Sequence, residues 1–294
     1  MKIGRKERAS QWIERREIGG QQINERVMDY HVYEMTNAEK LLYSLAAIVA
    51  GGFVGLLFYG GLFKENGQAT LLTYLCNAGV FLLAGMIGAA VFLPMRKEQL
   101  LEKRRKELRS QFRDMLQSLT NSLMAGSTVN DAFNSALKSM RERNSAGQYA
   151  KSPYIMWELD QMVAESTHAN IKLEDMLEDF AKRSGVEDIE DFSNVFRVAR
   201  GPGGNIREIM NNTQNIIGEK MAIEDEITSK MQSNRLELNV IIVSPIVIVA
   251  FLRFGNGAFG EKFTTPSGLI ASTIGIIMFL AAWYLGQWIV RSVR

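Results

Sequence analysis

The sequence predicts an all-α, polytopic membrane protein in which two transmembrane hairpins flank a cytoplasmic bundle of helices. Four apolar runs, each close to the length that crosses a bilayer, lie in two pairs toward the ends of the 294-residue chain. The charged segment between the pairs repeats apolar residues at the spacing of helices. Basic residues concentrate on one side of the four runs, as they do in loops that stay in the cytoplasm.

The average composition hides this segregation. Hydrophobic residues make up 47% of the chain and charged residues 22%, values that an ordinary soluble protein would also have. The formal net charge of +2 gives no reason to expect nucleic acid as a partner. Because the chain has one cysteine, Cys76, in an apolar run, and two histidines, we expect no disulfide framework and no metal or cofactor site.

The apolar runs divide the chain into segments. No apolar region follows the first basic residues, so we expect no cleavable signal peptide. Thr36-Asn37-Ala38-Glu39 has the form of a capping box and predicts a helix start near Asn37. The predicted organisation is a cytoplasmic N-terminal segment at 1–40, a transmembrane hairpin at 41–93, a six-helix domain at 94–235, a second transmembrane hairpin at 236–290 and a tail at 291–294.

The four predicted spans have distinct punctuation. They cover about Leu41–Phe63, Ala69–Leu93, Leu238–Phe254 and Gly268–Val290. Pro94 is expected to stop the second span, and Pro245 to kink the third. In the first hairpin the pairs Gly51 and Gly55, and Ala84 and Gly88, would let two helices approach closely, although membrane helices are rich in glycine in any case.

The distribution of basic residues predicts the orientation. The cluster Lys103-Arg104-Arg105-Lys106 and the residues Arg96, Lys97 and Arg291 fall on one side, whereas the hairpin loops contain little beyond Lys64 and Lys262. The positive-inside rule then puts the N-terminus, the central segment and the C-terminus in the cytoplasm of a multi-pass protein of the cell (inner) membrane. The basic run at 96–113 could also bind anionic lipid headgroups.

Apolar residues in the central segment predict six helices. They cover about Leu108–Leu123, Thr128–Leu137, Ile155–Val163, Ile171–Phe180, Ile189–Ala199 and Ile206–Met221. Thr128 and Asn205 each precede an acidic residue by three positions, as side-chain caps do. We expect the first helix to continue from the second span and the sixth to run on toward the third.

Two surface features are candidates for partner contact. Glu187, Asp188, Glu190 and Asp191 belong to an acidic stretch, which is either a solvated face or a docking surface for a basic partner. A carboxylate cation site would need several oxygens converging on one point.

The second feature is the glycine turn at Gly201–Gly204, which precedes a predicted helix. This position can bind phosphate, but the turn lacks the Gly-Lys-Ser/Thr of nucleotide loops and follows a helix, so a structural turn is favoured. Gly203, Gly204, Asn205 and Arg207 are candidates for partner contact here.

Catalysis and transport find little support. The apolar runs contain almost no charge, whereas coupled transporters usually carry ionisable groups near the midplane. No Gly-x-Ser-x-Gly or His-Glu-x-x-His sequence occurs. We therefore do not expect an enzyme.

Three motifs resemble the type II secretion system F domain. The run Phe112–Phe133 resembles its opening, and Leu173–Arg183 and Gly203–Ile209 resemble its middle and closing motifs. The resemblance covers about Arg105–Phe251, half of the chain. One departure is Thr167–Lys172, where the family pattern would place a glycine.

This resemblance implies an inner-membrane platform that couples a cytoplasmic hexameric secretion ATPase to the assembly of pilin subunits. One domain copy between two hairpins looks like the tight-adherence (Tad/Flp) pilus type, which implies a paralogous F-domain membrane protein as a partner and a homo- or hetero-oligomer. The filament type stays open among Tad, type IV, type II secretion and archaellum. Two alternatives remain, a transporter or channel subunit with a regulatory helical domain, and a passive membrane scaffold.

Overall fold

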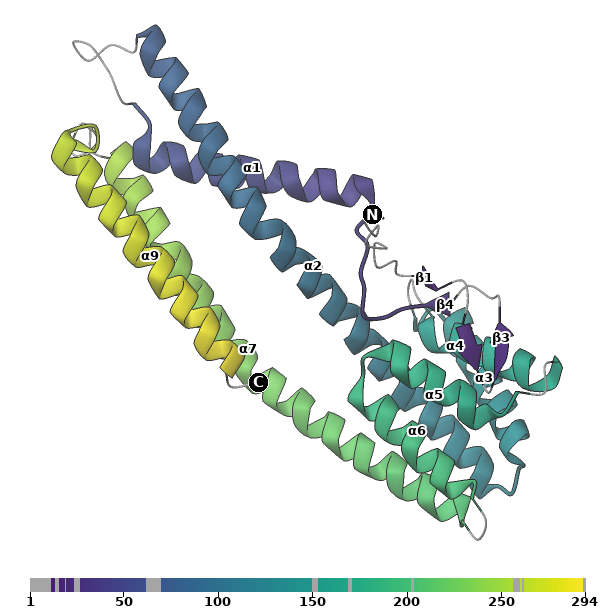
Figure 1. Ribbon diagram of the computed structural model, residues 1–294. Helices are drawn as coiled ribbons and strands as arrows, with labels where there is room; N and C mark the ends of the chain where they lie inside the picture. The colour runs from purple at the N-terminus through teal and green to yellow at the C-terminus, as the bar shows by residue number, and fades with distance from the viewer. Residues whose placement is uncertain are drawn as a thin grey trace, which may run out of the picture. The chain divides into compact units, whose positions relative to one another are not determined.

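The chain is mostly helical in the computed structural model (Figure 1), which describes residues 12–13, 16–18, 20–23, 27–61, 70–149, 153–168, 171–201, 204–255, 260 and 262–292. The elements are β1 (Trp12–Ile13), β2 (Arg16–Ile18), β3 (Gln21–Ile23), β4 (Val27–Met28), α1 (Asn37–Tyr59), α2 (Leu71–Met124), α3 (Val129–Ser145), α4 (Tyr154–His168), α5 (Leu173–Ser184), α6 (Glu187–Ala199), α7 (Ile206–Gly255) and α9 (Pro266–Ser292).

The chain forms two compact units. The bundle unit contains Met1–Glu34 and Lys97–Glu226, and the apolar unit contains Met35–Arg96 and Ile227–Arg294. Two of the boundaries between these units lie inside a helix, one in α2 and one in α7.

The prediction of an all-α chain is wrong for the N-terminal segment. There β1 pairs with β4 and β2 with β3, both antiparallel. Ile18 pairs with Gln21, and Gly20 between them has φ +80°, a left-handed conformation that suits glycine in a tight hairpin. The Gly-Gly dipeptide at 19 and 20 is the sequence signal for this turn. Ile18 and Met28 join the core of the bundle unit, so these strands are part of its packing.

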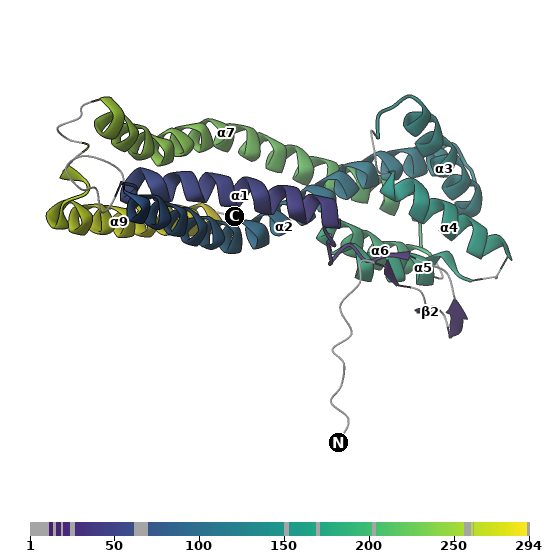
Figure 2. The same cartoon turned by 90° about the horizontal axis from the view of Figure 1, so that it is seen from above.

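Each of the six helical stretches predicted for the central segment corresponds to a helix, although α5 begins at Leu173, two residues later than predicted. Figure 2 shows α3 to α6 gathered around the second half of α2. Their apolar faces form one core, in which the rings of Phe112 and Phe192 lie 5.4 Å apart and those of Phe133 and Phe196 lie 5.7 Å apart, both edge to face. Such pairs add about 1 kcal/mol each to the gain from burial.

Local sequence sets where these helices begin and end. The Thr128 hydroxyl accepts the Asp131 N–H at 3.3 Å, as the predicted cap requires. At the next predicted cap the Asn205 amide donates to Glu208 at 3.0 Å. Gly185 ends α5 at φ +62°, where any side chain would be strained.

The helix α2 runs through Pro94, just as α7 runs through Pro245, so Pro94 lies at the end of the second apolar run without ending the helix. A proline removes one backbone hydrogen bond, and the many bonds on both sides of it keep these helices of 54 and 50 residues intact. The predicted continuation of the second apolar run into the charged segment, and of the last bundle helix into the third run, is confirmed.

Two described helices, Asn37–Tyr59 and Leu71–Met124, are long and apolar enough to cross a membrane, judged by length and composition. Shorter apolar helical stretches cover Val243–Gly255 and Pro266–Met278. The apolar side chains of α1 and the first half of α2 are largely exposed, with Leu71 at 78% and Ile87 at 66%.

Small residues bring α1 and α2 together, as the two glycine pairs predict. A Cβ on Gly51 would lie 2.9 Å from the carbonyl oxygen of Ala84, and one on Gly55 would lie 2.5 Å from the Ala84 Cβ. A Cβ on Gly88 would lie 3.3 Å from the carbonyl oxygen of Ala47. The backbones therefore pack at a separation that larger side chains would not permit.

The apolar unit also contains one arginine in a structural role. Arg253 of α7 donates to the carbonyl oxygens of Leu57 and Gly60, at the C-terminal end of α1. The last turn of α1 has no basic residue of its own. Arg253 thus supplies the positive charge and the donors that a helix C-terminus lacks.

Candidate functional site

The predicted acidic surface exists only in part. Glu187, Glu190 and Asp191 are exposed in the first turns of α6. Asp188 is 2% exposed and belongs to the interior, so its assignment to an exposed docking face is wrong. The position repeats the spacing of the buried residues Phe192 and Phe196, which is why the helix turns it inward.

Asp188 sits in an ion-pair cluster that joins three helices of the bundle unit. Arg109 of α2 donates to Asp188 of α6 and to Glu224 of α7, the latter also through a second nitrogen at 3.1 Å. Lys220 of α7 lies 3.0 Å from Asp188 and 3.3 Å from Glu187. Burial lowers the pKa of Arg109, but the hydrogen bonds to Glu224 and Asp188 outweigh it and raise that pKa above its ordinary value. The hydrogen bond to Asp188 likewise raises the pKa of Lys220.

An open pocket of about 210 Å³ lies beside this cluster. It is lined by Arg105, Lys106, Arg109, Gly185, Val186, Glu187, Asp188, Lys220 and Glu224. Four cations and three carboxylates line it, and most of them already bond one another. The charges around the pocket therefore nearly cancel. The ion pairs among them connect α2, α6 and α7.

Carboxylates of the preceding helix, α5, are also paired. Glu174 accepts from Arg200 at 2.8 Å, and this hydrogen bond lowers the pKa of Glu174 despite the opposing effect of burial. Glu178 pairs with Lys182 and Arg197. Glu190 and Asp191 are exposed, as is Glu187, whose carboxylate lies beside Lys220.

The glycine-turn candidates do not form one surface with the acidic residues. The turn follows the end of α6, whereas Glu190 and Asp191 lie near its start; a helix of 13 residues is about 20 Å long. Gly204, Asn205 and Arg207 are exposed, and Gly203 lies outside the described residues. A Cβ on Gly204 would lie 2.3 Å from the carbonyl oxygen of Ala199, so glycine is needed for packing at this turn.

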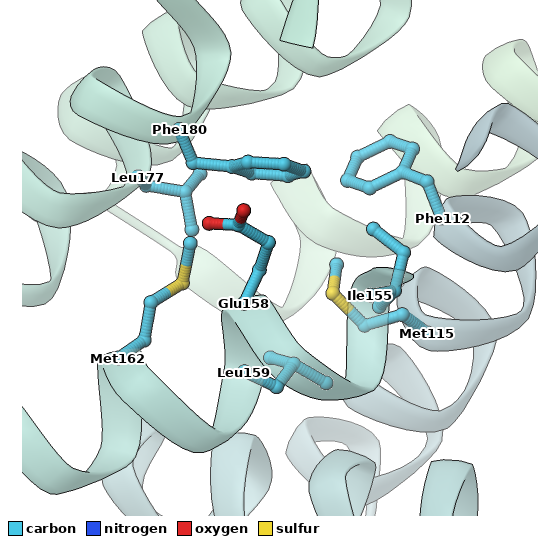
Figure 3. A pocket seen from close by; sticks show the side chains of 8 residues that line it. All are labelled: Phe112, Met115, Ile155, Glu158, Leu159, Met162, Leu177 and Phe180. Atoms are coloured by element: carbon cyan, nitrogen blue, oxygen red, sulfur yellow. The ribbon is translucent and has the colours of Figure 1, made fainter. Parts of the chain in front are cut away.

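A buried polar site, absent from the sequence predictions, connects α4, α5 and the N-terminal segment. Arg183 bonds Glu158 at 2.7 and 3.0 Å and Asp179 at 2.8 Å. The Tyr30 phenol donates to Glu158 at 3.1 Å. Figure 3 shows the Glu158 carboxylate among Phe180, Leu177 and Met162, beside a cavity of only about 10 Å³. A space of that size holds at most one water, so Arg183 and Tyr30 must replace the carboxylate's solvation.

The pKa values of this site follow from its burial. Burial and the Glu158 charge raise the pKa of the Tyr30 phenol well above its ordinary value. Burial lowers the pKa of Arg183, but the charges of Glu158 and Asp179 outweigh that effect and raise it. Tyr30 is thereby held neutral and Arg183 charged, which is typical of a structural network.

The N-terminal residues around Tyr30 are held by further contacts. We name residues 28–33 the strap. Arg183 donates to the carbonyl oxygen of Met28 at 2.8 Å, and the Tyr30 N–H donates to the carbonyl oxygen of Arg183 at 2.9 Å. His31 Nε2 lies 2.9 Å from the carbonyl oxygen of Lys182.

Two arginines of the basic run also bind the strap. Arg104 donates to the carbonyl oxygen of Val32 at 3.3 Å and lies over the Tyr33 ring, 4.5 Å from its centre. Arg105 donates to the carbonyl oxygen of Tyr30 at 3.4 Å. These contacts occupy part of a run that the sequence offered for lipid binding.

Metal-ligating groups do not gather in the described part of the chain: no three His, Cys, Asp or Glu side chains there come together in a way that could hold an ion. Comparison of the chain with models of protein families, with curated proteins and with solved structures found no match.

Proposed function

We propose that this chain is the inner-membrane platform of a type IV or Tad-like pilus or a type II secretion machine, which couples a cytoplasmic ATPase to the assembly of pilin subunits. The observation that supports it most is the sharing of α2 and α7 between the bundle unit and the apolar unit. A domain that must pass movement into a membrane needs stiff connections, and an uninterrupted helix is the stiffest that a single chain offers.

The side chains of the apolar unit support a membrane setting. A core helix of a soluble protein buries its apolar residues, whereas α1 and the first half of α2 expose most of theirs. Exposed apolar surface of this extent is stable in lipid. The proposed topology has four spans, with the bundle unit and both termini in the cytoplasm, on the strength of the basic residues.

The ion-pair cluster suggests how the bundle would act on both shared helices. Arg109 of α2 is bonded to Glu224 of α7, and Asp188 of α6 bonds cations of both. A partner that displaces α6 would therefore pull on α2 and α7 at the same time, through the ion pairs of Asp188. The exposed residues Glu190 and Asp191, in the same helix as Asp188, are our proposed docking point for basic side chains of the ATPase.

The first experiment is purification of the tagged full-length chain from its native host in mild detergent, followed by identification of bound proteins by mass spectrometry. Recovery of a hexameric secretion ATPase together with a second F-domain membrane protein is the expected result. If neither were recovered with a chain that retains its thermal unfolding transition, the platform proposal would be wrong. Ion or solute flux in liposomes would then test the transporter alternative.

The docking point has a matched test. Reversing Glu190 and Asp191 to lysine should reduce ATPase recovery while the unfolding temperature stays near that of the wild type. The control reverses Glu142 and Asp225, exposed carboxylates of α3 and α7, and should leave recovery unchanged. If both double variants recovered the same amount of ATPase, the acidic docking point would be wrong and the platform proposal would stand.

The topology is tested with single cysteines in a Cys76→Ala chain. Ser145→Cys at the end of α3 should resist a membrane-impermeant maleimide in spheroplasts, and Ser267→Cys at the start of α9 should react. Labelling of Ser145→Cys in sealed spheroplasts would reverse the proposed orientation.

A further inference from the structure

The strap contacts the bundle unit through its main chain at alternate residues. The carbonyl oxygens of Met28, Tyr30 and Val32 each accept from an arginine. The three arginines come from two elements, α2 and α5, so the strap is bound to both of these helices. These three hydrogen bonds hold the main chain of the strap against α2 and α5.

Tyr30 is the anchor of the strap. Its side chain is completely buried, and its ring packs edge to face against Tyr154 at 5.7 Å and Phe180 at 6.2 Å. Its phenol reaches Glu158, which also binds Arg183. Withdrawal of this side chain would leave a buried carboxylate short of one donor and open a hole the size of a tyrosine in the core.

The strap leads directly into α1. Only Glu34, Met35 and Thr36 separate Tyr33 from the first residue of that helix. The start of α1 is itself fixed, because the Thr36 N–H donates to Glu39 at 2.9 Å. Three residues span at most about 10 Å when fully extended, so the connection has little slack.

We propose that the strap is a third mechanical link between the bundle unit and the membrane, acting on α1 as the continuous helices act on α2 and α7. This inference rests on the proposed function, since a link has a role only if the bundle moves. α1 is the one apolar helix of the first hairpin that does not itself extend into the bundle unit. Without the strap, α1 would follow the bundle only through its contacts inside the apolar unit, such as its packing on α2 and the hydrogen bonds from Arg253 of α7.

The test adds slack to the strap and leaves its anchor intact. A flexible Gly/Ser insert of ten residues between Glu34 and Met35 adds a root-mean-square length of roughly 17 Å. The control places the same insert between Gly147 and Gln148, in the turn after α3. Both full-length variants are compared with the wild type for ATPase recovery, for surface filaments in the native host and for protection of the Tyr30 N–H from hydrogen exchange.

The strap insert should keep ATPase recovery and Tyr30 protection and lose filament assembly, and the control insert should keep all three. Filaments at the wild-type level with the strap insert would overturn the proposal. Loss of ATPase recovery with the strap insert would also overturn it, because the segment would then act in docking. Failure of the wild type to recover the ATPase identifies failure of the proposed function instead.

A second variant tests the anchor without reference to function. Tyr30→Ala should accelerate exchange of the strap amides in the purified protein and leave the amides of α3 unchanged. Unchanged exchange in the strap would show that Tyr30 does not hold it, and the proposal would fall whatever the platform does.

Discussion

The hydrogen bond from Tyr30 to Glu158 can be removed with almost no change in shape by Tyr30→Phe. A hydrogen bond to a charged acceptor contributes about 1.5–3 kcal/mol to stability. The acceptor, Glu158 Oε1, also receives an Arg183 nitrogen at 3.0 Å, so the carboxylate is not left bare. We therefore expect the substitution to lower the free energy of opening the strap by about 1.5 kcal/mol, the lower end of that range.

Native-state hydrogen exchange measures this quantity directly. The Tyr30 N–H donates to the carbonyl oxygen of Arg183 at 2.9 Å and can exchange only when the strap opens. A loss of about 1.5 kcal/mol corresponds to roughly tenfold faster exchange. Tyr30→Ala also removes a buried ring, and a loss of about 4 kcal/mol should bring exchange close to the unprotected rate.

The control is Tyr149→Phe. The Tyr149 phenol donates to Asp114 at 3.1 Å, so this substitution removes the same kind of bond elsewhere in the bundle unit. It should leave exchange at Tyr30 unchanged. If Tyr30→Phe exchanged at the wild-type rate, the phenol would contribute nothing and the strap would depend on its main-chain contacts alone.

Three further predictions follow from particular contacts. Gly85→Val should lower the unfolding temperature in detergent, because its Cβ would lie 2.7 Å from a carbonyl oxygen of α1; Gly79→Ala, with nothing within 4 Å, should be tolerated, and equal effects would argue against close packing. Asp188→Asn should destabilise the chain by about 2 kcal/mol in denaturant unfolding. This loss is smaller than for a fully buried ion pair, because the partner cations of Asp188 are partly exposed. The control Asp191→Asn should have no effect. Burial and nearby Asp114 raise the pKa of Tyr149 to about 12 from 10.0, so its contribution to stability is complete below pH 10 and disappears as pH rises through 12; Tyr149→Phe should remove this part of the alkaline loss in unfolding temperature.

Local patterns were sufficient to predict most of the helices. The caps at Thr128 and Asn205 and the close approach at Gly51 and Gly55 depend on neighbours in the chain or on residue size, and both can be read from a single sequence. The helix continues past Pro94, as predicted, because a proline removes one hydrogen bond, whereas many bonds flank it on both sides.

The buried polar site was harder to predict because its parts are far apart in the sequence. Tyr30 and Glu158 are 128 residues apart, and no local pattern pairs them. A signal did exist in each helix: Glu158 lies three residues after Ile155 on the buried face of α4, and Arg183 lies three after Phe180 on that of α5. Charged residues at core-facing positions predict buried partners, although their identity needs the tertiary structure.

The separation of Tyr30 from its partners also has a consequence for biosynthesis. The carbonyl oxygen of Met28 accepts from Arg183, which is synthesised 155 residues later. At ordinary translation rates the ribosome needs roughly 10–30 s to make the intervening chain. On the proposed topology both helices of the first hairpin emerge in that interval, so they must enter the bilayer while the strap is still unpaired. The strap can therefore close onto the bundle unit only after the hairpin has inserted, and a nascent chain whose first helix entered the membrane in the wrong orientation would hold the strap on the side opposite its binding site.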